Sequence, residues 1–150
     1  MTDLVLAIVH HACVFTLAGL LIAEVALLRP GMTAERIRQL GAVDLAYGIM
    51  AGVVIVVGIV RVNFDDKGAD YYVRNAAFWL KMASFVAVGL LSLPPTLAFI
   101  GWRRRLVSDP GFVPAAAEVS RARAFFIAEI VGFALIVGFA AAMARGYGSF

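Results

Sequence analysis

The fold is decided by the apolar stretch LVLAIVHHACVFTLAGLLIAEVALL at residues 4–28. A helix needs about 20 such residues to cross the hydrocarbon core of a bilayer. Arg29, Pro30 and Gly31 follow at once, and proline and glycine end helices. The stretch has no positively charged residue before it and is longer than the apolar part of a signal peptide. We therefore expect a retained membrane-spanning helix.

Three further apolar stretches lie at about 40–62, 77–102 and 124–144. The chain of 150 residues is 63% hydrophobic and 15% charged, whereas soluble domains are nearer a quarter charged. Too few charges remain to cover a soluble surface, which excludes a soluble enzyme, a disordered tail and a nucleic-acid binder. We predict an all-α protein in which residues 1–150 form one integral membrane domain, an antiparallel four-helix transmembrane bundle. Pro94 and Pro95 predict a kink in the third helix, with either simple packing or a cavity beside it.

Arginine and lysine residues indicate the orientation, because cytoplasmic loops of membrane proteins carry an excess of them. The first and third loops are rich in arginine, whereas the second loop, 65–74, carries several aspartates that offset its positive charges. We therefore expect a bacterial inner-membrane protein with the arginine-rich loops in the cytoplasm and both termini on the periplasmic side. The arginines of the first and third loops are Arg29, Arg36, Arg38, Arg103, Arg104, Arg105, Arg121 and Arg123.

Ionisable residues within the apolar stretches sort by depth. A charge at membrane depth is costly and usually marks a site, a pathway or a pair. The basic residues lie toward the exterior and the acidic residues toward the cytoplasm. The basic set is His10, His11, Arg61, Lys81 and Arg145, and the acidic set is Glu24, Asp44 and Glu129.

The acidic set allows two interpretations. Glu24 and Asp44 flank the first arginine-rich loop, so they either pair with its arginines (Arg29, Arg36 or Arg38) or form part of an intramembrane site. Glu129 lies about one and a half turns into the fourth stretch, where it must be protonated, paired or beside a wet cavity. His10 and Glu24 are fourteen residues apart and fall within about 40° on one helix face. We expect that face to point into the bundle.

The basic set suggests a cofactor site. Imidazole is a common ligand of metals and of haem iron, and His10 is the candidate ligand. Adjacent helical residues point about 100° apart, so His10 and His11 cannot hold one iron from both sides. His10 would act with Lys81, Met143, water or no second ligand, or the haem would be shared between subunits. Arg61 and Lys81 either extend their charged ends to the membrane interface or complete the predicted site for haem b or a porphyrin.

Several short strings carry a resemblance. Together they resemble a family of short bacterial four-helix inner-membrane proteins of unknown function, which implies a four-helix membrane protein. The strings are AIVHH at 7–11, DLAYG at 44–48, GIVRV at 58–62, KGADYY at 67–72, FWLKM at 78–82, LPPT at 93–96 and ARGYG at 144–148.

A more distant resemblance concerns the histidine near the outer end of the first stretch and the tryptophan-then-lysine pattern of Trp79 and Lys81. These features are similar to those of HemJ-type protoporphyrinogen oxidases and of the CopD copper-resistance membrane domain. The resemblance implies that His10 is a haem ligand, that Lys81 contacts the cofactor or substrate, and that Arg61 is a propionate partner.

Three functions are compatible with these features, and the sequence leaves open whether the protein is an enzyme. The first is a haem- or porphyrin-binding membrane redox protein. The second is a small oligomeric transporter or channel in which Glu129 carries a proton or cation. The third is a non-catalytic subunit or assembly factor of a larger membrane complex. The expected partners of the protein are the lipid bilayer and either further copies of the same chain or a larger membrane complex.

Overall fold

The computed structural model describes residues 2–64 and 68–149. The helices of these residues are α1 (Thr2–Leu27), α2 (Ala34–Phe64), α3 (Ala69–Val73), α4 (Ala76–Ser108) and α5 (Ala116–Ala144). Four of them, α1, α2, α4 and α5, are long and apolar enough to cross a membrane. The predicted all-α architecture with four membrane-spanning helices is confirmed.

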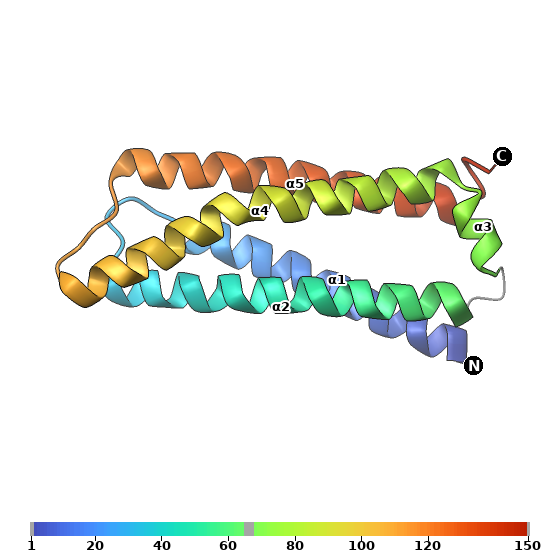
Figure 1. Cartoon of the computed structure of the whole chain (residues 1–150), viewed down its shortest axis with the longest axis horizontal. Coiled ribbons are helices and arrows are strands. Elements are labelled where there is room, and N and C mark those ends of the chain that lie inside the picture. Colours follow the sequence, from blue (N-terminus) through green and yellow to red (C-terminus); the bar gives the residue numbers. More distant parts are fainter. Residues whose placement is uncertain (1, 65–67, 150) are drawn as a thin grey trace.

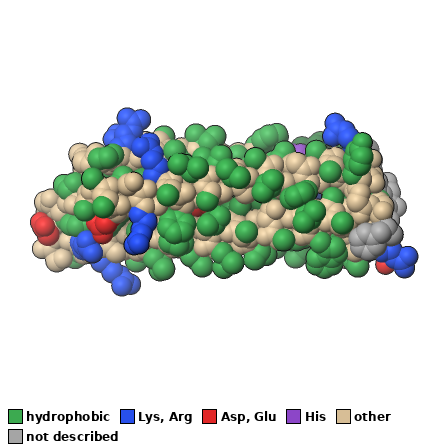
Figure 2. Space-filling model, turned by 90° about the horizontal axis from the view of Figure 1, so that it is seen from above, with side chains coloured by type: hydrophobic (Ala, Val, Ile, Leu, Met, Phe, Trp, Pro, Cys, Tyr) green, Lys and Arg blue, Asp and Glu red, His purple; other side chains and the backbone are tan. Residues whose placement is uncertain are grey.

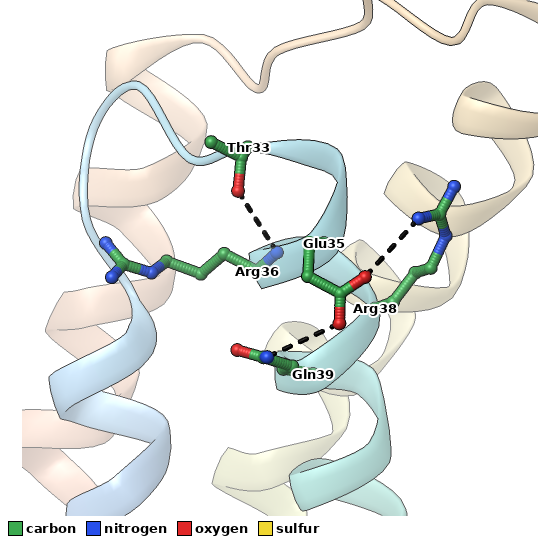
Figure 3. Close-up of polar contacts among 5 residues, drawn as sticks. All are labelled: Thr33, Glu35, Arg36, Arg38 and Gln39. Atoms are coloured by element: carbon green, nitrogen blue, oxygen red, sulfur yellow. Dashed lines mark hydrogen bonds and ion pairs between the residues drawn. The ribbon is translucent and has the colours of Figure 1, made fainter.

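Helices α2, α4 and α5 begin before the predicted spans, and a polar side chain stabilises each of these starts: Thr33 for α2, Asn75 for α4 and Glu118 for α5. α2 begins at Ala34, ahead of its apolar stretch. The Thr33 hydroxyl stabilises this start by accepting a hydrogen bond from the backbone nitrogen of Arg36 (3.3 Å; Figure 3). The second loop contains the short helix α3, which the sequence did not predict. The acidic residues Asp65 and Asp66 of that loop lie outside the described residues.

The bundle consists of two helical hairpins. α1 packs along α2, and α4 packs along α5, while the hairpins meet mainly through α2 and α4 (Figure 1). Both chain termini and α3 lie at one end, here called the terminal end. The connections between α1 and α2 and between α4 and α5 lie at the opposite end, here called the loop end. This is the up-and-down arrangement that short connections favour.

The surface agrees with a membrane setting. Figure 2 shows hydrophobic side chains along the middle of the molecule, with lysine and arginine side chains gathered toward the two ends. Many large apolar residues are exposed there, for example Phe15, Ile49 and Leu97. In lipid such residues are in their preferred solvent, because lipid tails are as apolar as leucine.

The buried core is concentrated between the kink of α4 and the loop end. The ring of Phe99 packs against Trp102 and Phe126, with centroid distances of 5.3 and 6.1 Å. All three residues are at most 2% exposed. Two glutamates, Glu24 and Glu129, are buried within the same half of the bundle, so the tightest packing surrounds the acidic residues.

The predicted kink is present in α4, which runs through Pro94 and Pro95 without ending. Figure 1 shows the C-terminal half of α4 turning away from α5 toward α2. Prolines lack a backbone donor and leave carbonyl groups one turn earlier without their helical partner. The Ser92 hydroxyl donates to the Gly89 carbonyl (2.8 Å), which is not one of the carbonyls that the prolines release, and Thr96 donates elsewhere. Thr96 lies beside the prolines, where its hydroxyl could have bonded a free backbone carbonyl, but it does not do so.

Candidate functional site

Three carboxyl groups meet inside the bundle, and we call Glu24, Asp44 and Glu129 the acidic cluster. They come from α1, α2 and α5 respectively, and they interact electrostatically with one another. Glu24 is 1% exposed and Glu129 is 0% exposed, while Asp44 is half-buried. The inward face of α1 predicted from its polar residues is therefore correct at Glu24.

Two side chains from other positions bind the cluster. The Tyr47 hydroxyl donates to Glu129 Oε2 at 3.3 Å. The Thr96 hydroxyl donates to Asp44 Oδ1 at 2.7 Å. Tyr47 lies on α2 and Glu129 on α5, whereas Thr96 lies on α4 and Asp44 on α2. Both hydrogen bonds therefore join the two hairpins.

The acidic cluster has no basic partner among residues 2–64 and 68–149. The ion pairs of this part of the chain are Arg38–Glu35 and Arg105–Glu118, each at 3.5 Å. Figure 3 shows Arg38 and Gln39 both directed at Glu35. Arg29 donates instead to the backbone carbonyl of Ala26. The predicted alternative in which Glu24 and Asp44 pair with these arginines is wrong for the described residues, because the carboxyl groups face inward and the arginines outward.

Several oxygens of the cluster are buried without a hydrogen-bond partner. Both carboxylate oxygens of Glu24 and Oε1 of Glu129 make no well-formed hydrogen bond with any described residue. The carboxyl group of Glu24 nevertheless faces that of Asp44. An ionised carboxylate is costly to bury unless it is paired. Facing carboxyl groups in such a place avoid that cost by holding a proton between them.

A pocket of about 80 Å³ adjoins the acidic cluster and reaches the kink of α4. Its polar lining comes from Asp44, Tyr47, Ser92 and Thr96, and its remaining walls are apolar side chains and glycines. A cavity needs about 10–15 Å³ measured in this way to hold one water molecule. The pocket therefore has room for several, next to two groups that hydrogen-bond the acidic cluster.

Three basic side chains meet nearer the terminal end, and we call His10, Arg61 and Lys81 the basic cluster. They come from α1, α2 and α4, and they lie within electrostatic range of one another. All three are half-buried. The His10 ring packs against α2 at Gly58, where a Cβ atom would lie 3.4 Å from His10 Cε1. The basic residues that the sequence assigned to one depth are thus brought together.

Buried nitrogens of the basic cluster also lack partners. His10 Nδ1 and Arg61 Nε make no hydrogen bond with any described residue. The Lys81 ammonium group lies 5.1 Å from the centroid of the Phe78 ring, a cation–π distance. His11, by contrast, is exposed, and its Nδ1 lies 2.6 Å from the Ala7 carbonyl oxygen. His10 is therefore the histidine that faces the bundle.

The described residues contain no group of three or more histidine, cysteine, aspartate or glutamate side chains arranged to hold a metal ion. Ligation of a haem iron or metal by His10 stays a prediction, and its buried Nδ1 makes no hydrogen bond with a described residue that would orient the ring. Sequence reasoning missed Tyr47 as a partner of Glu129. Its position three residues after Asp44 places both on one helix face, which is the signal that was available.

Comparison with known proteins assigns the chain to a family. The family model described as "Predicted membrane protein (DUF2214)" matches residues 2–148, and the chain belongs to this family of membrane proteins. No curated protein and no solved structure matches the chain. The predicted membership of a short membrane-protein family is confirmed, while the likeness to HemJ-type and CopD proteins stays a prediction.

Proposed function

We propose that this member of the family is a small transport protein that moves protons, with the acidic cluster as its intramembrane proton-binding site. One observation carries the proposal: Glu129 is 0% exposed, and its Oε1 has no hydrogen-bond partner among the described residues. A carboxyl group held in this way inside a membrane protein needs a proton or a cation to be stable. A proton meets this need directly, because a protonated carboxyl group carries no charge to bury.

The neighbours of Glu129 support proton exchange rather than permanent protonation. The Tyr47 hydroxyl both donates and accepts hydrogen bonds, and it contacts Glu129 on one side and the pocket on the other. Asp44 and Thr96 also line the pocket. Water in the pocket would accept a proton from the acidic cluster and return it. Chains of acidic side chains relay protons in this way in pumps and transporters.

Proton flux in proteoliposomes tests this proposal. A pH-sensitive dye trapped inside the vesicles would report the flux that follows a jump in external pH. We expect flux with the native chain, and we expect Glu129→Gln to abolish it because the amide cannot release a proton. Glu35→Gln is the matched control, since Glu35 is exposed and outside the acidic cluster; it should leave the flux unchanged. Absence of flux with the native chain, or unchanged flux with Glu129→Gln, would overturn the proposal.

The orientation and the assembly belong to the same proposal. We place the loop end in the cytoplasm and both termini on the periplasmic side of a bacterial inner membrane, on the strength of the arginine-rich loops. A reporter that is active only in the periplasm should be active when fused after Phe150 and inactive when inserted at Gly31. Translocation through so small a bundle favours a homo-oligomer or a place in a larger membrane complex, which native mass spectrometry of the purified protein would detect. A monomer alone would count against that part.

Haem or porphyrin binding at the basic cluster is the second candidate function, and the unpartnered Nδ1 of His10 favours it. A haem iron would take His10, and its propionates would take Arg61 and Lys81. When bound, the group would supply one-electron chemistry. An absorption spectrum of protein purified with ample haem tests this: a Soret band that disappears with His10→Ala and persists with His11→Ala is expected. Native protein without the band would exclude this candidate.

A further inference from the structure

The basic cluster carries a positive charge that the rest of the described bundle does not neutralise. Arg61 and Lys81 are both half-buried and lie within electrostatic range of each other. The two ion pairs of the described residues lie elsewhere, on exposed side chains near the loop end. Like charges that share a partly desolvated place repel each other. A bound anion would remove this repulsion.

The donors of the basic cluster suit an anion with oxygen atoms. Arg61 Nε is a donor only, and it is buried without an acceptor among the described residues. Arginine presents a planar fork of donors that matches phosphate or carboxylate, and lysine binds phosphate as a point charge. The three side chains of the basic cluster come from three different helices, α1, α2 and α4.

The position of the cluster indicates where the anion comes from. Lys81 lies two residues after Trp79, whose side chain is 54% exposed and whose indole nitrogen donates to the Val73 carbonyl (3.0 Å). Tryptophan is enriched where the membrane meets water, the level at which lipid phosphate groups lie. The long side chains of Arg61 and Lys81 can reach toward that level while their stems stay in apolar surroundings.

We infer that His10, Arg61 and Lys81 form a binding site for a phosphate group at the terminal end of the bundle. The phosphate belongs to an anionic lipid headgroup or to a free phosphate ion. The site would hold the end of the bundle at the membrane surface. This inference goes beyond proton transport and does not depend on it, because the acidic cluster lies in the other half of the bundle.

Two measurements on the delipidated full-length protein separate the two sources. Native mass spectrometry measures binding of phosphatidylglycerol, and thermal unfolding in detergent measures stabilisation by inorganic phosphate. Loss of one charge-assisted contact should weaken binding about tenfold or more, so Lys81→Gln and Arg61→Gln should each show this loss. Lys81→Arg should retain binding. Arg145→Gln is the matched control, because Arg145 is exposed at the same end, and its binding should equal that of the native chain.

The outcomes decide the inference whichever source is correct. Charge-dependent retention of phosphatidylglycerol identifies the lipid headgroup, and a charge-dependent rise in unfolding temperature with phosphate alone identifies the free ion. Equal binding by the native chain, Lys81→Gln and Arg61→Gln in both measurements would overturn the site. Phosphate binding that appears only when Asp65 and Asp66 are changed to asparagine would also overturn it, since the chain would then neutralise the cluster itself. Proton flux through the native chain can persist in any of these cases, so failure here is distinguishable from failure of the transport proposal.

Discussion

Replacing Asn75 with alanine should destabilise the terminal end of the bundle more than any comparable change of a polar side chain there. Asn75 is 0% exposed and is the N-cap of α4. Its Oδ1 accepts a hydrogen bond from the Phe78 backbone nitrogen at 3.2 Å. Its Nδ2 donates to the Tyr147 carbonyl at 3.2 Å and to the Ser149 hydroxyl at 3.4 Å. One side chain therefore both starts α4 and holds the C-terminal residues against it.

The expected loss follows from these contacts. An N-cap replaced by alanine costs about 1 kcal/mol, and each ordinary hydrogen bond contributes a net 0.5–1.5 kcal/mol or so. The bond to Ser149 is long and should count least. We expect Asn75→Ala to lower the free energy of unfolding by about 2–3 kcal/mol. Asn75→Ser should lose roughly half as much, because serine caps a helix as well as asparagine does but is too short to reach the C-terminal residues.

Reversible denaturation in mixed micelles, followed by the helical circular dichroism signal, would measure these differences. Asn63→Ala is the control, since Asn63 is exposed and, among the described residues, its side chain bonds only to its own helix at the Ile59 carbonyl; its effect should stay within about 0.5 kcal/mol. Asn75→Ala should also speed proteolytic cleavage of the C-terminal residues. An Asn75→Ala protein as stable as the Asn63→Ala protein, with unchanged cleavage, would refute the reasoning.

Two further predictions concern the contacts between helices. Tyr47→Phe should lower the stability by about 1–3 kcal/mol in the same denaturation assay, because it leaves both oxygens of buried Glu129 without a partner; no loss would show that this bond contributes nothing. Gly132→Ala should destabilise by about 1 kcal/mol, because its methyl group would lie 2.5 Å from Val88 Cγ2 and the crowding exceeds the gain in helix propensity. The methyl group of Gly138→Ala would have no atom within 4 Å, so this substitution should be neutral or stabilising. A Gly132→Ala protein that is more stable than the Gly138→Ala protein would contradict the packing at Gly132.

Much of the candidate site could be anticipated from positions along the chain. Helical periodicity placed His10 and Glu24 on the inward face of α1, and depth placed His10, Arg61 and Lys81 at one level. The partners were harder to foresee. Whether Glu24 meets an arginine or Asp44 depends on a rotation of α1 by a fraction of a turn, and both arrangements satisfy the same sequence pattern. Thr96 stood beside two prolines, where satisfying the backbone was an equally good use for its hydroxyl.

The sequence by itself determined that the protein is a four-helix membrane bundle with acidic and basic residues at opposite depths. Long apolar stretches have few alternatives, because lipid requires every backbone polar group to be satisfied within a helix. Only the tertiary structure decided which polar side chains meet. Tyr47 reaches Glu129 and Thr96 reaches Asp44 across the boundary between the hairpins. Such contacts depend on how the two hairpins rotate and shift against each other by a few ångströms. Apolar surfaces allow many such arrangements, and close packing of the side chains selects one of them.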